Sequence, residues 1–131
     1  MNFALDAHAL TAYFEKEPGY EKVQELLTEA ASNGRSLLLS AVNWGEVFYV
    51  TYREHGKGAA DQIARIIDEF PVEVVSVDVP LAHQAAICKA THKMSYADCL
   101  AAALAKIRKS TLVTGDKDFK QVEGEIKVVW L

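Results

Sequence analysis

Short apolar segments alternate with longer amphipathic segments along this chain of 131 residues, and the alternation constrains the fold more than any other feature. Residues 36–40 read SLLLS, an unbroken apolar run that is typical of a parallel strand buried on both faces. When segments of helical length separate such strands, the chain returns through right-handed crossovers and the strands pair in parallel. The sequence therefore predicts an α/β fold, a three-layer α/β/α sandwich with a mainly parallel sheet.

Proline and glycine mark the ends of the predicted elements. We expect strands at residues 3–6, 36–40, 72–77, 111–114 and 126–131. We expect helices at residues 20–32, 42–55, 58–70, 81–91 and 96–109, and a further helix that begins at residue 7. The chain shows no repeat, linker or low-complexity segment, and its length suits one ordinary core. Residues 1–131 are therefore expected to form a single domain.

Nothing in the sequence suggests a membrane. The first strand follows the first residue without a basic leader, and no apolar run approaches the roughly 20 residues that span a bilayer. We expect a cytoplasmic protein. Cys88 and Cys99 have no further Cys or His at zinc-binding spacing, and we expect them to be reduced thiols in the core.

Four acidic residues stand where the chain turns from strand to helix or opens a helix: Asp6, Glu46, Asp98 and Asp116. In open α/β sheets the ligand crevice lies beyond the carboxyl ends of the strands, where Asp6 and Asp116 fall. Carboxylates gathered there would repel one another, by roughly 4 kcal/mol for a pair at 4 Å and an effective dielectric of 20. A divalent cation would offset this repulsion, and ligands that are all oxygen favour Mg²⁺ or Mn²⁺ over zinc.

Three of these acids also have a purely structural interpretation. Asp6 suits the N-cap of the helix that follows it, and Asp98 completes a capping-box pattern that begins at Ser95. Asp116 suits an Asx turn after its strand. Glu46 is harder to explain in this way, because apolar and aromatic residues surround it on the same helix and an unpaired buried carboxylate is unfavourable.

The segments FALDAHALTAYF, SAVNWGEV, SYADCLAAALA and LVTGDKDF resemble, in order and spacing, the four acidic motifs of PIN-domain nucleases. The size of the chain is similar to that of VapC-type toxin ribonucleases of type II toxin-antitoxin pairs. This resemblance implies an Mg²⁺- or Mn²⁺-dependent endoribonuclease whose metal-binding quartet matches Asp6, Glu46, Asp98 and Asp116. It also implies supporting roles for Thr114 and Asp118. Many relatives carry Ser or Thr after the first acid, whereas this chain carries Ala7.

The same chemistry follows from the residue types. Hydrolysis of a phosphodiester needs an activated water and cations on the phosphate oxygens, and one or two Mg²⁺ ions held by carboxylates would supply both. Asp6, Asp98 and Asp116 are the expected direct or water-bridged ligands. Glu46 is expected either to be a ligand or to orient the attacking water. No histidine is required as a base, although His8 lies two residues after Asp6.

A net charge of −4 argues at first against a nucleic-acid partner. Residues 89–120 nevertheless carry a local charge of +4, which leaves −8 on the rest of the chain. The lysines nearest to the acids in sequence, Lys93, Lys117 and Lys120, are the candidates for RNA contact. Solvated lysines on helix faces are the alternative. Trp44, Phe48 and Tyr52 recur at helical spacing and suit a core stripe, a dimer seam or a base-stacking platform.

Two other classes of function stay open. The first is an Mg²⁺-dependent phosphoryl-transfer domain, although His8 stands where the common phosphatase arrangement has a second Asp. Residues 114–116, TGD, stand where a receiver domain has a Lys after a late strand. The second is a catalytically silent interaction module in which the acids are only caps. The resemblance further implies an RNA substrate, a small cognate antitoxin and a homodimer. The sequence leaves open the RNA cleaved, the number of metals and the choice between a toxin and a housekeeping nuclease.

Overall fold

The computed structural model describes residues 2–131 and contains one parallel sheet of five strands in the order β3-β2-β1-β4-β5. All four strand pairings are parallel. The strands are β1 (Phe3–Leu5), β2 (Leu37–Ser40), β3 (Val72–Val75), β4 (Thr111–Thr114) and β5 (Val128–Trp130). Because β1 and β4 lie at the centre of the sheet, the loops that follow them share one crevice.

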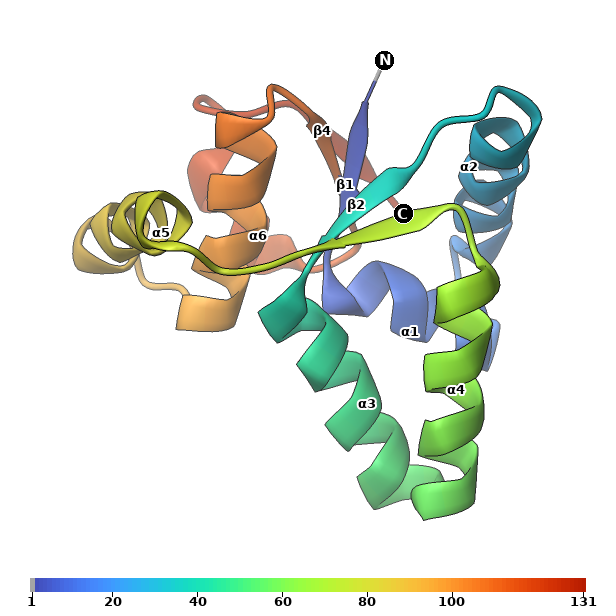
Figure 1. The fold of residues 1–131 in the computed structure, drawn as a ribbon. Coiled ribbons are helices and arrows are strands. Elements are labelled where there is room, and N and C mark those ends of the chain that lie inside the picture. Colours follow the sequence, from blue (N-terminus) through green and yellow to red (C-terminus); the bar gives the residue numbers. More distant parts are fainter. Residues whose placement is uncertain (1) are drawn as a thin grey trace.

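Helices cover both faces of the sheet, and this arrangement confirms the predicted three-layer sandwich (Figure 1). They are α1 (Ala7–Glu15), α2 (Tyr20–Ser32), α3 (Ala41–His55), α4 (Lys57–Glu69), α5 (Val79–Thr91) and α6 (Tyr96–Ile107), with a 3₁₀ helix η1 (Lys117–Val122). One face carries α1, α2 and α4 together with α3, whose far end extends away from the sheet beside α4 (Figure 1). The other face carries α5, α6 and η1.

The leucine run of β2 shows why the chain needs both helical layers. Leu38 belongs to the core under α5 and α6, whereas Leu37 and Leu39 belong to the core under α1, α2 and α4. In β4, Leu112 and Val113 divide in the same way. Successive side chains of a strand point to opposite faces, so an unbroken apolar run fills two cores at once.

Several element boundaries differ by a few residues from those expected. The third strand ends at Val75 because its last partner is Ser40, the final residue of β2. The fifth strand begins at Val128, since the amide of Ile126 still donates to the carbonyl of Val122 in the preceding turn. Helix α5 begins at Val79, where Asp78 caps it and a proline in the first turn is tolerated. Helix α6 ends at Ile107, before the left-handed residue Lys109.

No helix among residues 2–131 is both long enough and apolar enough to cross a bilayer. The two cysteines lie at the contact between α5 and α6. Cys99 is fully buried and Cys88 is partly buried, and both are free thiols, as expected.

Candidate metal centre

Asp6 lies at the carboxyl end of β1 and is only 2% exposed. Its Oδ1 accepts the backbone N–H of Ala9 at 2.8 Å, so Asp6 caps α1 as predicted. Its Oδ2 accepts the hydroxyl of Thr114 at 2.5 Å, and Thr114 in turn accepts the amide of Asp116 at 2.9 Å. Thr114 therefore joins the acid after β1 to the acid after β4.

Asp98, Asp116 and Asp118 form the tightest group of acids in this region. One carboxylate oxygen from each lies within 4.8 Å of the others. Asp98 stands in the first turn of α6, where its amide donates to Ser95 at 3.1 Å. The Oδ1 of Asp116 accepts the amide of Asp118 at 2.9 Å, which is the predicted Asx turn. The sequence suggested only a supporting role for Asp118, whereas the geometry gives it the same place as Asp98 and Asp116.

Glu46 reaches the same crevice from the second turn of α3, and a buried asparagine holds it there. The side-chain nitrogen Nδ2 of Asn43 donates to Glu46 Oε1 at 2.8 Å and to the backbone carbonyl of Ala97 at 3.2 Å. The hydroxyl of Ser40 donates to Asn43 Oδ1 at 2.6 Å. Asn43 is fully buried and ties α3 to the start of α6. Sequence reasoning missed this residue, although its spacing of three from both Ser40 and Glu46 was a readable signal.

Two of these carboxyl groups have strongly raised pKa values. Burial raises the pKa of Asp6 to about 7, and repulsion from Asp98 and Asp116 adds to this increase. The hydrogen bonds from Thr114 and Ala9 lower the pKa and offset part of it. Partial burial raises the pKa of Asp98 to about 6. Asp116, Glu46 and Asp118 contribute to that increase by repulsion, and the bond with Ser95 opposes it. The four predicted acids therefore lie close enough to influence one another electrostatically.

The donor set fits a hard divalent cation. Every side-chain donor of the group is a carboxylate or hydroxyl oxygen, which is what Mg²⁺ and Mn²⁺ prefer. Within the described chain, no Lys, Arg or His forms an ion pair with Asp6, Glu46, Asp98, Asp116 or Asp118. Without a cation, burial and the gathered negative charge raise the pKa values of Asp6 and Asp98 and so favour protonation, against the hydrogen bonds that stabilise the ionised forms.

His8 lies beside the acids but does not belong to the group. It projects from the first turn of α1, and its Nδ1 accepts the amide of Gly115 at 3.3 Å. A Cβ atom at residue 115 would lie 2.5 Å from His8 Cε1, so only glycine leaves room for the imidazole in this position. His8 therefore positions the loop after β4 against α1, and no histidine acts as a partner of the carboxylates.

The basic segment of residues 89–120 divides between the two ends of the sheet. Lys93 lies beside η1, because Gln121 bonds both the amide and the carbonyl of Lys93 at 3.0 Å. Lys117 and Lys120 belong to η1 itself, and all three lysines are exposed near Asp118. Lys106 and Lys109 lie instead at the far end of α6. The local charge is therefore not one patch.

A second group of potential ligands lies far from the crevice, where the ends of α1 and α3 meet. Glu15, Glu54 and His55 are all exposed there, and His55 Nε2 pairs with Glu15 at 2.8 Å. This ion pair already accounts for the cluster, in contrast to the acids of the crevice.

The predicted aromatic stripe forms a row of three neighbouring rings along α3, of which only the first two are stacked. The Trp44 and Phe48 rings lie 5.6 Å apart and nearly parallel, and Phe48 and Tyr52 lie 6.2 Å apart. Trp44 packs against the core, whereas Tyr52 is 47% exposed. The stripe is thus core at one end and open surface at the other.

Solved structures share this architecture. They include a toxin-antitoxin complex from Klebsiella pneumoniae, with a TM-score of 0.74, 19% identity and coverage of 98% of this chain and 96% of that chain. The toxin VapC20 of Mycobacterium tuberculosis, which cleaves the sarcin-ricin loop, has a TM-score of 0.74 and 21% identity over 92% of this chain and 95% of that chain. VapBC2 of Rickettsia felis, bound to a promoter DNA fragment, has a TM-score of 0.74 and 16% identity over 100% of this chain and 99% of that chain.

At these identities the similarity establishes the fold. No curated protein sequence matches the chain significantly. The family model described as PIN domain matches residues 3–125, which include every acid of the crevice. Since the match covers nearly the whole sequence, the chain belongs to the PIN domain family.

Proposed function

We propose that this protein is a metal-dependent endoribonuclease and the toxin of a type II toxin-antitoxin pair. One observation carries the proposal: acids from β1, α3, α6 and the loop after β4 converge without a basic partner among the described residues. Membership of the PIN domain family and the fold shared with toxins such as VapC20 support it.

Asp98, Asp116 and Asp118 are the side chains that would hold a cation most directly, because their oxygens already lie within 4.8 Å of one another. Asp6 would complete the site from the buried side, where Thr114 and the amide of Ala9 fix its carboxylate. Glu46 would face the site from α3 in the orientation that Asn43 imposes. Mg²⁺ is the expected ion, with Mn²⁺ as a substitute.

When bound, Mg²⁺ supplies a water of lowered pKa and positive charge for the phosphate oxygens. The protein's own residues would determine where the phosphodiester sits relative to that water. Glu46 would orient that water and accept its proton through the carboxylate oxygen that Asn43 does not engage. Lys93, Lys117 and Lys120 are exposed next to the acids and would neutralise phosphates of the bound RNA.

Two protein partners belong to the same proposal. Solved structures of this fold include a toxin-antitoxin complex and a VapBC pair on DNA, so we expect a small cognate antitoxin for this chain. We also expect a homodimer. Val42, Tyr49 and Tyr52 are exposed along α3 and would form an apolar seam between two copies.

Cleavage of labelled total transfer RNA and ribosomal RNA tests the proposal, with Mg²⁺, Mn²⁺ or EDTA. We expect discrete products with either metal and none with EDTA. Asp98→Asn should abolish the products, whereas the control Asp68→Asn, an exposed acid of α4, should cleave normally. Metal binding without cleavage by the wild type would contradict the nuclease and favour a silent interaction module.

A further inference from the structure

The end of the sheet opposite the acids carries a basic cleft that the proposed chemistry does not use. A cavity of about 370 Å³ lies where β1 and β4 begin, and its lining includes Asn2, Lys106, Lys109, Ser110, Thr111 and Lys127. The lysines come from the end of α6, the loop after it and the approach to β5. The fold thus gathers three cations that lie up to 21 positions apart in the sequence.

These lysines lack acidic partners. Among the described residues, none of Lys106, Lys109 and Lys127 forms an ion pair. Glu125 also lines the cavity, where its carboxylate is hydrogen-bonded to His92 at 2.9 Å, so the three lysines outnumber one acid and the cleft keeps a net positive charge. The contrast with Arg108 is informative, because this neighbouring cation pairs with Glu73 at 3.2 Å and lies on another side of the strand ends. The charge of the cleft is therefore available to a ligand.

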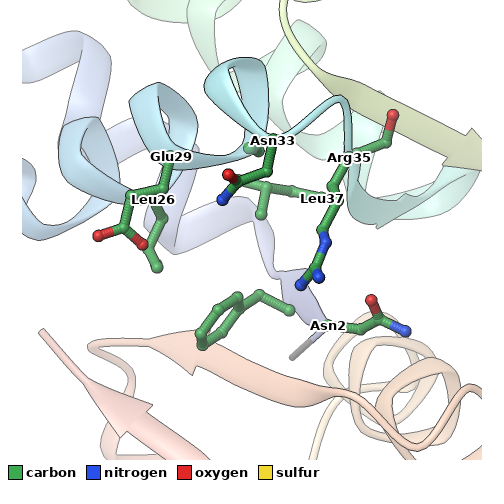
Figure 2. A pocket seen from close by; sticks show the side chains of 9 residues that line it. Asn2, Leu26, Glu29, Asn33, Arg35 and Leu37 are labelled. Carbon is green, nitrogen blue, oxygen red and sulfur yellow. The ribbon is translucent and has the colours of Figure 1, made fainter.

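A second cavity adjoins the basic cleft, and Asn2 lines both the cleft and this second cavity. Figure 2 shows Arg35 extending from the loop after α2 toward Asn2, with Glu29 at the opposite side of the cavity. The described structure gives Arg35 no ion pair and no side-chain hydrogen bond. Four cations from separate parts of the chain thus lie around the amino ends of the central strands.

We infer that the basic cleft binds the phosphate backbone of the RNA substrate, at a distance from the site of cleavage. The inference rests on the proposed nuclease function. Lysines act as point charges for phosphates. Thr111 and Asn2 also line the cleft, and their side-chain hydroxyl and amide groups are uncharged donors of the kind that contact nucleic-acid backbones. The acids and the cleft face opposite ends of the sheet, so one RNA would have to pass along the side of the molecule to contact both.

The helix dipole offers a purely structural alternative. Cations in the last turn of α6 interact favourably with the carbonyl end of the helix. This explains Lys106 and Lys109, and it also covers Arg35, whose amide bonds the carbonyl of Ala30 in the last turn of α2. It does not explain Lys127, which belongs to no helix terminus. If the dipole were the whole reason, removing the lysines would lower the thermal stability and leave RNA binding unchanged.

Binding of fluorescent total transfer RNA in EDTA tests the inference without hydrolysis. The test variant combines Lys106→Gln, Lys109→Asn and Lys127→Gln, with Asn chosen because it tolerates the left-handed backbone of Lys109. The control combines Lys22→Gln, Lys57→Gln and Arg65→Gln, exposed cations of α2 and α4, and has the same net charge. The midpoint of thermal unfolding is recorded for both.

We expect the test variant to bind at least about tenfold more weakly at about 50 mM salt. The slope of log K against log salt should become shallower by about 2 to 3, because each of the three lost contacts contributes about 0.7 in single-stranded and about 0.9 in duplex nucleic acid. The control should bind like the wild type. Equal binding by all three proteins, equal weakening of both variants, or equally tight binding of a polyglutamate peptide of similar charge would overturn the inference.

If the triple variant does not fold, the single reversal Lys127→Glu, at an exposed position ahead of β5, replaces it with a smaller expected loss in the same direction. The nuclease proposal fails separately. Wild-type protein that binds RNA in EDTA but never cleaves it with Mg²⁺ would refute the nuclease, whereas cleavage with unchanged affinity in the test variant would refute only the cleft.

Discussion

At the carboxyl ends of β1 and β4 several carboxylates gather beside His8, whereas in the cleft at the amino ends of the same strands three lysines outnumber the one acid, Glu125. The direction of the helices accounts for part of this difference, although not for Lys127, which lies at no helix terminus. Helices α1, α3 and α5 begin at the carboxyl ends, and α2, α4 and α6 return to the amino ends. Acids are favoured at helix N-termini and cations at C-termini, by about 0.3–1 kcal/mol each.

The charged groups at the two ends also differ in burial, and helix dipoles do not account for that difference. Asp6 is 2% exposed and has a pKa near 7, whereas Lys106, Lys109 and Lys127 are exposed. A shift from 3.8 to about 7 corresponds to about 4 kcal/mol of unfavourable free energy for the ionised acid, as an order of magnitude. Folding therefore sacrifices stability at the acidic end, as is typical of functional sites, while the basic end has no such cost.

Neutralising the buried acid should produce the largest effect. In Asp6→Asn we expect RNA cleavage to fall more than about 100-fold, since loss of even an outer-shell partner of a metal site typically costs 10- to 100-fold. The same change should raise the free energy of unfolding of the metal-free protein at pH 7.5 by about 1–3 kcal/mol. Removing the buried charge contributes about 4 kcal/mol while the amide oxygen keeps the bond from Ala9, and about 1–3 kcal/mol is lost because the amide NH₂ cannot accept the hydroxyl of Thr114. Urea unfolding and cleavage assays measure the two effects. A loss of both stability and activity would contradict this interpretation.

The stability of the metal-free protein should depend on pH in a direction set by Asp6 and Asp98. Between pH 4 and 7 the acid of Asp6 is ionised in the unfolded chain and largely protonated in the folded one, so the folded state binds more protons. Stability should therefore fall as pH rises through this range, by up to about 4 kcal/mol for Asp6 and further, up to about pH 6, for Asp98.

Saturating Mg²⁺ should remove most of this fall, because a bound cation favours the ionised carboxylates. Urea unfolding at pH 5 and pH 7.5, with EDTA or with Mg²⁺, measures the difference, and Asp6→Asn serves as the control with a smaller pH dependence. Stability that rises with pH in EDTA for the wild type relative to Asp6→Asn would refute the electrostatic interpretation.

Removing the buried asparagine should weaken the acidic end without touching an acid. Asn43→Ala leaves the hydroxyl of Ser40, the carbonyl of Ala97 and Glu46 without their partner, so we expect a loss of about 2–3 kcal/mol. Cleavage should fall by about 10- to 100-fold, since Glu46 loses its orientation. Thr51→Ala is the matched control on α3, with a loss of about 1 kcal/mol and normal cleavage. Equal cleavage by the two variants would show that Asn43 serves only the fold.

We expect the smallest effect, on RNA affinity, from replacing the lysines near the acids, and this effect can be compared with that of the lysines of the basic cleft. Replacing Lys93, Lys117 and Lys120 with Gln should weaken RNA binding and make the salt slope shallower by about 2. If both sets contact one RNA, combining them should add their effects on the slope. Binding that is unchanged in this variant would leave the basic cleft as the only RNA contact and would remove the sequence-based assignment.

The fold was predictable because the pattern of apolar residues is unambiguous. The run at Leu37–Ser40 and the strand at Thr111–Thr114 are typical of buried parallel strands. Asp6 and Asp116 follow strands and were therefore expected at one edge of the sheet, whereas Glu46 and Asp98 lie within helices and strand ends alone did not place them there. What the sequence could not reveal depends on contacts between distant residues. Asn43 donates a hydrogen bond to Ala97, which lies 54 positions later in the sequence. Lys127 and Lys106 line the same cavity only because β5 pairs with β4.

Paramagnetic broadening by Mn²⁺ in an amide NMR spectrum tests directly whether the acidic crevice holds a metal. We predict that substoichiometric Mn²⁺ broadens the amides of Asp98, Asp116 and Asp118 first, leaves those of Thr111 and Lys127 at the basic end sharp, and loses this pattern in Asp98→Asn. Broadening that begins instead at Glu15, Glu54 and His55, or that leaves the crevice unaffected at saturation, would contradict the metal centre and the nuclease built on it.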